Sequence, residues 1–365
     1  MDVAALTAEL MTIPGLCGHE GRVRARIRRE LDAIGLAHAT DVLGNLTTTL
    51  PGDPEAPSVM LIAHMDQLGF MVRRIEKDGF LRLERVGGVP ERALAAQPML
   101  ICVGEGRDVT GIVANKAHHA TTPDEKYAVV PYPEIYLDAG FRSADEVEAA
   151  GIRIGTPVVY APAVRRLANG LLAGTSVDDR AGCAVMLAVA RALATGEGRR
   201  PTVHLAFSVQ EEFNLRGVLP AVHALKPAIA IQIDLVLATD TPDMAARGDV
   251  RLGGGPAMGL YSFHGRGTLN GLIPHPALTG LFERTAAAAG LPLQRSVHIG
   301  ALTETSYVQI AGTGVACLDV GFPMRASHSA NEVVDPADLD ALARLIVAAL
   351  HGIGPGFPLD PDATG

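Results

Sequence analysis

The chain has 365 residues, and its 48% hydrophobic and 19% charged residues are typical of a folded globular protein. Its length exceeds that of one ordinary hydrophobic core, so we expect two domains. The net charge of −9 argues against nucleic acid as a partner. The first residues, MDVAALTAELM, lack the basic region of a signal peptide. No apolar run reaches the roughly 18 residues of a membrane span, so we expect a cytoplasmic protein without a membrane partner.

The cysteines are scattered and show no C-x-x-C spacing. This pattern favours reduced, buried thiols over disulfide bonds or a thiolate zinc site. A zinc ion, if present, must therefore be held by histidine and carboxylate side chains. The cysteines are Cys17, Cys102, Cys183 and Cys317.

The N-terminal part of the chain predicts two helices within residues 1–36, separated at Pro14-Gly15, and then a buried strand over residues 58–63. The strand ends in His64-Met65-Asp66. A metal-bound imidazole usually gives its other N–H to a carboxylate, so His64 is a candidate ligand with Asp66 behind it. A surface turn is the alternative interpretation of this short motif.

Residues 67–164 differ in character from the flanking sequence. Short β-like segments alternate there with glycines and charged residues, as in a small β-rich domain, and the α/β pattern resumes afterwards. We therefore predict an inserted domain. The predicted boundaries are 1–66 and 165–355 for the two parts of an α/β catalytic domain, 67–164 for the insertion and 356–365 for a tail.

The segment VHLAFSVQEE, residues 203–212, is an apolar strand that ends in two adjacent carboxylates, Glu211 and Glu212. Adjacent residues of an extended chain point to opposite sides. The two glutamates should therefore have different roles, one on a metal ion and one facing a substrate. A solvated acidic turn is the alternative.

Two more apolar strands end near residues that can bind a metal ion. Residues 228–233 precede Asp234, and residues 314–320 precede His328. Asp178 begins a helix, where it could instead act as a cap. Because parallel strands share one carboxyl edge, these residues and those after the two earlier strands predict a single site. Its two histidines and three carboxylates exceed the three protein ligands of a catalytic zinc and suit two cations that share a bridging carboxylate.

The chain resembles the tetrahedral aminopeptidase and glutamyl aminopeptidase family of dinuclear metallopeptidases. The resemblance extends over nearly the whole sequence, and AHMD, DDR and QEE in this order are its most specific part. The matching motifs are PGLCGHEGRVR, DVLGN, AHMDQLGFMV, YLDAGFRSADEVEAAGIRIG, VDDRAGC, QEEFNLRG, ATDTPD and HSANEVV.

This resemblance implies an α/β catalytic domain, with a mixed and largely parallel sheet flanked by helices, interrupted by a small β-barrel-like dimerisation domain. It implies one metal ion on His64, Asp178 and Asp234, and a second on Asp178, Glu212 and His328. Glu211 would be the general base, and Asp66 would orient His64. The metals would be zinc first, with cobalt or manganese as alternatives, and the subunits would form dimers that build a dodecamer. Related two-metal sites also imply a cis peptide between Asp178 and Asp179.

The sequence departs from the family pattern at three places. Ala301-Leu-Thr-Glu304 replaces Gly-Gly-Thr-Asp, Ala330 replaces the proline of His-Ser-Pro, and Ala117-His118 replaces a proline-rich turn. The predicted activity is hydrolysis of the N-terminal bond of a short peptide by a metal-activated water. Two alternatives stay open at this point: a metal-dependent deacylase of small N-acylated substrates, and an inactive binding scaffold.

Overall fold

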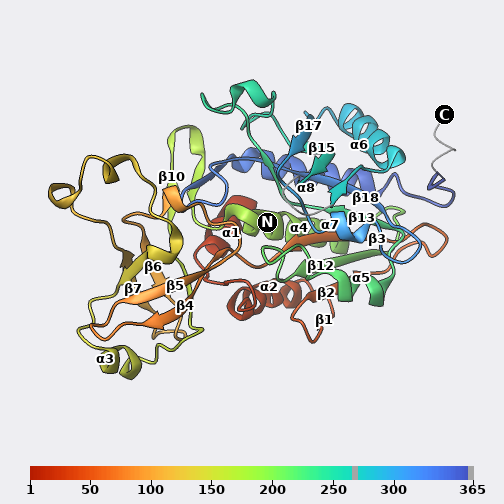
Figure 1. The fold of residues 1–365 in the computed structure, drawn as a ribbon. Coiled ribbons are helices and arrows are strands. Elements are labelled where there is room, and N and C mark those ends of the chain that lie inside the picture. The colour runs from red at the N-terminus through yellow and green to blue at the C-terminus, as the bar shows by residue number, and fades with distance from the viewer. Residues whose placement is uncertain (265–269, 361–365) are drawn as a thin grey trace.

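The computed structural model describes residues 1–264 and 270–360, which form an α/β fold with a second, β-rich body at one end (Figure 1). This arrangement confirms the fold class predicted from the sequence. Within the described residues, none of the helices has the length and apolar character needed to span a bilayer.

The larger body is built on a mixed sheet, to which the described residues contribute 13 strands. Its centre is parallel, in the order β12-β3-β13-β18, as the buried apolar runs predict. Antiparallel strands extend it on both sides. The strands are β1 (His38–Thr40), β2 (Leu46–Leu50), β3 (Val59–His64), β10 (Val164–Arg166), β11 (Leu172–Gly174), β12 (Val203–Ser208), β13 (Ile229–Gln232), β14 (Leu235–Leu237), β15 (Ala257–Phe263), β16 (Gly271–Leu272), β17 (Gln294–Ile299), β18 (Ala316–Arg325) and β19 (Glu332–Val334).

Helices cover both faces of this sheet because its central strands are apolar on both sides. Leu61 and Ala63 of β3 pack in the large core with α1, α2, α4, α6 and α8, whereas Met60 and Ile62 pack in a smaller core with α5 and α7. The helices are α1 (Val3–Met11), α2 (Gly21–Ala33), α4 (Val177–Thr195), α5 (Leu219–Leu225), α6 (Pro276–Ala289), α7 (Thr305–Val308) and α8 (Pro336–Leu350). Short 3-10 helices are η1 (Glu91–Ala93), η2 (His118–Ala120), η3 (Glu125–Tyr127), η4 (Tyr132–Glu134), η5 (Ala168–Gly170) and η6 (Ala245–Arg247).

The smaller body is a closed antiparallel barrel in the order β4-β5-β8-β7-β6-β9, with its own apolar core. The chain enters it after β3 and returns to the large sheet at β10, so the barrel is an insertion (Figure 1). The boundaries at residues 67 and 164 stay a prediction. The elements of the barrel are β4 (Gly69–Ile75), β5 (Leu81–Val86), β6 (Pro98–Ile101), β7 (Val109–Val113), β8 (Tyr136–Asp138), α3 (Ala144–Ala149) and β9 (Pro157–Tyr160).

Candidate active site

A pocket of about 640 Å³ opens at the carboxyl edge of the parallel strands. Side chains that follow β3, β12, β13 and β18 all reach this pocket, because parallel strands present their carboxyl ends at one edge of the sheet. Asp178, at the start of α4, joins them. The predicted site residues that line the pocket are His64, Asp178, Glu211, Glu212, Asp234 and His328.

The first metal-competent group consists of His64, Asp178 and Asp234, which are all buried and offer ligand atoms within 4.8 Å of one another. Nε2 of His64 lies 3.0 Å from Oδ1 of Asp178. Nδ1 lies 3.1 Å from the main-chain carbonyl oxygen of Asp66, which can only accept a hydrogen bond. In the neutral ring the proton is therefore on Nδ1, and Nε2 has the lone pair that a metal ion needs.

Asp66 contacts the site differently from the predicted arrangement. Its carboxylate lies 3.6 Å from Nδ1 of His64, beyond hydrogen-bond distance, so the main-chain carbonyl is the group that orients the ring. The two carboxylate oxygens accept hydrogen bonds from the backbone N–H groups of Glu211 and Glu212, each at 3.0 Å. Asp66 therefore fixes the backbone of both glutamates.

The second metal-competent group consists of Asp178, Glu212 and His328, again with ligand atoms within 4.8 Å of one another. Nε2 of His328 lies 3.5 Å from Oδ2 of Asp178 and 3.8 Å from Oε1 of Glu212. Asp178 thus belongs to both groups, with one oxygen toward each histidine. Glu211 belongs to neither; its Oε2 lies 3.9 Å from Nε2 of His64, and its side chain faces the pocket.

The acidic side chains of the site are buried close together, and this shifts their titration. Burial raises the pKa values of Asp234 and Glu211 well above the ordinary range, and it raises that of Glu212 to about 7. Burial alone would lower the pKa of His328, but the Glu212 and Asp178 carboxylates raise it to about 9. Buried like charges are costly unless cations compensate them, so this donor set suits metal ions.

Two further carboxylates hold the backbone of the candidate ligands, and sequence reasoning missed both roles. Oδ2 of Asp179 accepts a hydrogen bond from the N–H of His64 at 3.1 Å. Glu332 accepts from the N–H of Asp178 at 3.1 Å and from the N–H of His328 at 2.8 Å. Their presence in the DDR and HSANEVV motifs was the only available signal. The peptide bond between Asp178 and Asp179 is cis, which confirms that prediction.

The segment 209–218 carries both glutamates and is tied down at its two ends. Asn45 accepts a hydrogen bond from the N–H of Val209 at 3.1 Å and donates one to the carbonyl of Gly217 at 2.7 Å. Buried Glu304 accepts hydrogen bonds from Ser208 Oγ and from the N–H of Val218.

Within the segment, the backbone is left-handed at non-glycine residues, which costs about 1 kcal/mol or more for each of them. They are Gln210, Asn214 and Leu215, with φ of 58°, 73° and 58°.

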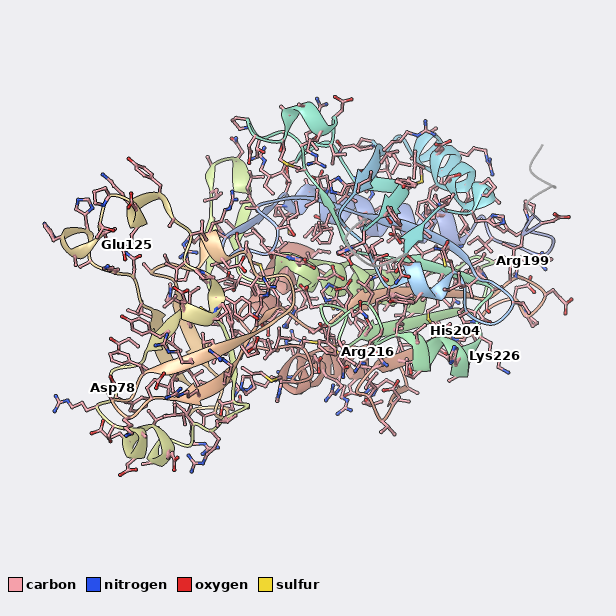
Figure 2. All side chains as sticks on the ribbon, viewed as in Figure 1. Asp78, Glu125, Arg199, His204, Arg216 and Lys226 are labelled. Atoms are coloured by element: carbon pink, nitrogen blue, oxygen red, sulfur yellow. The ribbon has the colours of Figure 1, made fainter. Side chains whose placement is uncertain are left out.

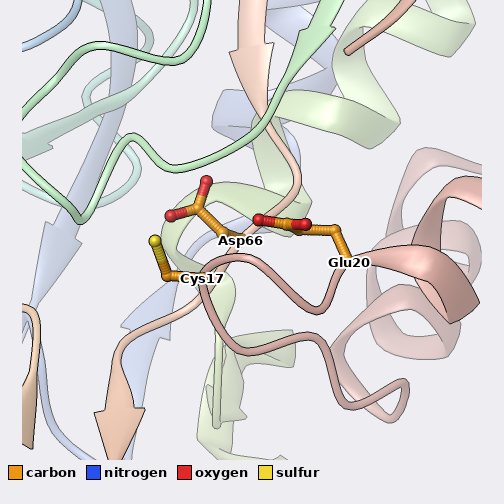
Figure 3. A group of neighbouring side chains, drawn as sticks. All are labelled: Cys17, Glu20 and Asp66. Atoms are coloured by element: carbon orange, nitrogen blue, oxygen red, sulfur yellow. The ribbon is translucent and has the colours of Figure 1, made fainter. Parts of the chain in front are cut away.

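A third group, Cys17, Glu20 and Asp66, also brings three potential ligand atoms within 4.8 Å (Figure 3). Both oxygens of Asp66 are already occupied by backbone N–H groups, and Glu20 accepts one from Gly18. Burial raises the pKa of the Cys17 thiol, and the nearby Asp66 carboxylate raises it further, so the thiolate that binds metal is disfavoured. Buried Arg180 supplies positive charge near both carboxylates, so this group does not fit a metal ion.

Residues 44–345 match the family described as M42 glutamyl aminopeptidase. The chain belongs to this family. It is 38% identical over 349 residues to SgcX of Escherichia coli (strain K12), with 95% of this chain and 93% of that protein covered. Aminopeptidase APDkam598 of Desulfurococcus kamchatkensis has the same fold with a TM-score of 0.90 and 31% identity, covering 97% of this chain and 96% of its own.

Another solved relative is the Pyrococcus horikoshii TET1 peptidase, which can assemble into a tetrahedron or a large octahedral shell. It matches with a TM-score of 0.84 and 25% identity, covering 95% of this chain and 99% of its own. The M42 protein described here is an aminopeptidase, and thus a hydrolase of peptide bonds. The inactive scaffold considered from the sequence is set aside.

Proposed function

We propose that the enzyme removes N-terminal residues from short peptides with two divalent cations, one held by His64, Asp178 and Asp234 and the other by Asp178, Glu212 and His328. The observation that carries this proposal is the position of Asp178, whose two oxygens face different histidines at 3.0 and 3.5 Å. A carboxylate placed in this way can bridge two ions.

Nitrogen and carboxylate ligands in threes suit zinc, with cobalt or manganese as alternatives. When bound, such cations supply a Lewis acid that makes water more acidic and polarises the scissile carbonyl.

Glu211 is the general base in this proposal, because it faces the pocket and belongs to neither ligand group. Its carboxylate takes a proton from the attacking water and passes it to the leaving amine. The hydrogen bonds that the backbone N–H groups of Glu211 and Glu212 donate to Asp66 fix the base relative to the neighbouring ligand.

The experiment that tests this proposal measures metal content and activity on the same purified protein. Chelation should remove activity, and adding back zinc, cobalt or manganese should restore it as two equivalents per subunit are bound. A protein that is fully active with one equivalent or with none would contradict the proposal.

We also propose that the subunits associate through the inserted barrel into dimers and then a dodecamer. The support is the assembly stated for TET1 and the apolar side chains exposed on the barrel. They are Ile112, Tyr127, Val129, Val130, Tyr136 and Ile154. The loop that carries three of them is marked by Glu125 in Figure 2 and lies on the side of the barrel away from the large sheet.

A further inference from the structure

One loop of the barrel, residues 87–90 after β5, reaches the active-site pocket. Gly88 and Pro90 line the pocket beside His328. The carbonyl oxygen of Gly88 lies 3.0 Å from Nδ1 of His328. Because a carbonyl can only accept, the neutral ring carries its proton on Nδ1, and its Nε2 lone pair then faces Asp178 and Glu212.

The fit between this loop and His328 is close. A Cβ atom added at Gly88 would lie 2.9 Å from Nδ1 and 3.1 Å from Cε1 of the His328 ring. One added at Gly87 would lie 3.4 Å from Oε2 of Glu212. Of the second ligand group, His328 is therefore in contact with the barrel, and Glu212 lies beside it.

The loop and the His328 segment are also anchored in the same core. Val89 is buried in the barrel core, and Ala330, two residues after His328, packs in that core as well. His64 differs, because the group that holds its Nδ1 is the Asp66 carbonyl, which directly follows β3 of the large sheet. The two histidines are thus oriented by different parts of the molecule.

We propose that the barrel is a working part of the second metal site: the Gly88 carbonyl fixes the ring of His328, so the metal affinity of this site depends on how the barrel docks on the catalytic part. The inference rests on the two-metal assignment proposed above. It gives residues 67–164, which contribute none of the proposed metal ligands, a part in holding the second metal ion.

The test is a calorimetric titration of the metal-free full-length protein with cobalt, for the wild type and for Gly88→Ala. The added methyl group should push the ring away, so one equivalent should bind as in the wild type and the other about 10–100-fold more weakly, as is usual when a group that orients a ligand is lost. The visible spectrum of bound cobalt should change for that equivalent only. The thermal midpoint of the metal-free protein should stay close to the wild-type value.

Gly104→Ala is the matched control, since it lies in the same barrel and the nearest atoms to its Cβ would be those of the flexible Arg107 guanidinium. It should bind both equivalents normally. If Gly88→Ala does not fold, Val89→Ala loosens the same loop from the barrel core and should weaken the same equivalent. Two unchanged affinities in the folded loop variant overturn the inference. A wild type that binds fewer than two equivalents contradicts the two-metal assignment, and the inference falls with it.

Discussion

Glu211 and Glu212 are neighbours in the chain with different surroundings, and this difference predicts opposite defects. Glu211→Gln removes a basic oxygen but no ligand, so both metals should stay while the rate falls about 10²–10⁴-fold. Glu212→Gln removes one of three ligands at one metal, so metal content should fall and excess zinc or cobalt should partly restore activity. Metal analysis and kinetics on both variants decide the matter. The reverse pattern would exchange the two roles, and full activity in both would place the site elsewhere.

At the residue scale, the candidate ligands could be predicted because each follows an apolar strand or begins a helix. The groups that hold them could not. Glu332 hydrogen-bonds to Asp178 from 154 positions away, and the Gly88 carbonyl reaches His328 across 240 positions. A contact to a backbone atom leaves no pattern in the sequence around it, so only the folded chain shows it.

At the scale of the element, Glu304 links α7 to the segment 209–218 and makes it sensitive to pH. Burial raises the pKa of Glu304 to about 7 from the ordinary 4.5. The folded state therefore keeps a proton that the unfolded chain has lost, and this contribution to stability is full below about pH 4.5 and declines as the pH rises to about 7.

Glu304→Gln should remove this dependence, because the amide can accept from Val218 N–H and donate to Ser208 Oγ. The difference in unfolding free energy between variant and wild type should change by up to about 1.4 kcal/mol per pH unit in that window, in favour of the variant at higher pH. Denaturant titrations from pH 4 to 8 with saturating metal measure it. Parallel profiles would mean that Glu304 is not protonated in the folded protein.

The elements themselves were predicted well where the apolar spacing is strong. The two N-terminal helices, β3 and β12 lie where the sequence predicts them. β18 is longer than expected, Ala316–Arg325, because it pairs with β13 through its first half and with β14 through its second half. Such pairing is a tertiary effect that the strand's own sequence does not show.

At the scale of the whole molecule, the exposed apolar loop of the barrel predicts self-association. Tyr127 is 86% exposed, and Val130 is 52% exposed. The double variant Tyr127→Asp/Val130→Asp should reduce the mass measured by light scattering while both metal equivalents stay bound. Val42→Asp, at a fully exposed position in the β1–β2 turn, is the control and should leave the mass unchanged. A wild type that is monomeric at micromolar concentration would refute the assembly but not the catalytic proposal.

The carboxylates of Asp66, Asp179 and Glu332 accept hydrogen bonds from main-chain N–H groups rather than from side chains. These hydrogen bonds hold the backbone whatever side chain the residue carries. A single substitution during evolution, for example His328→Asp, could therefore replace a ligand while the chain path and the neighbouring positions stay in place. The preferred metal should then differ among members of this family through single substitutions, without a change in the fold.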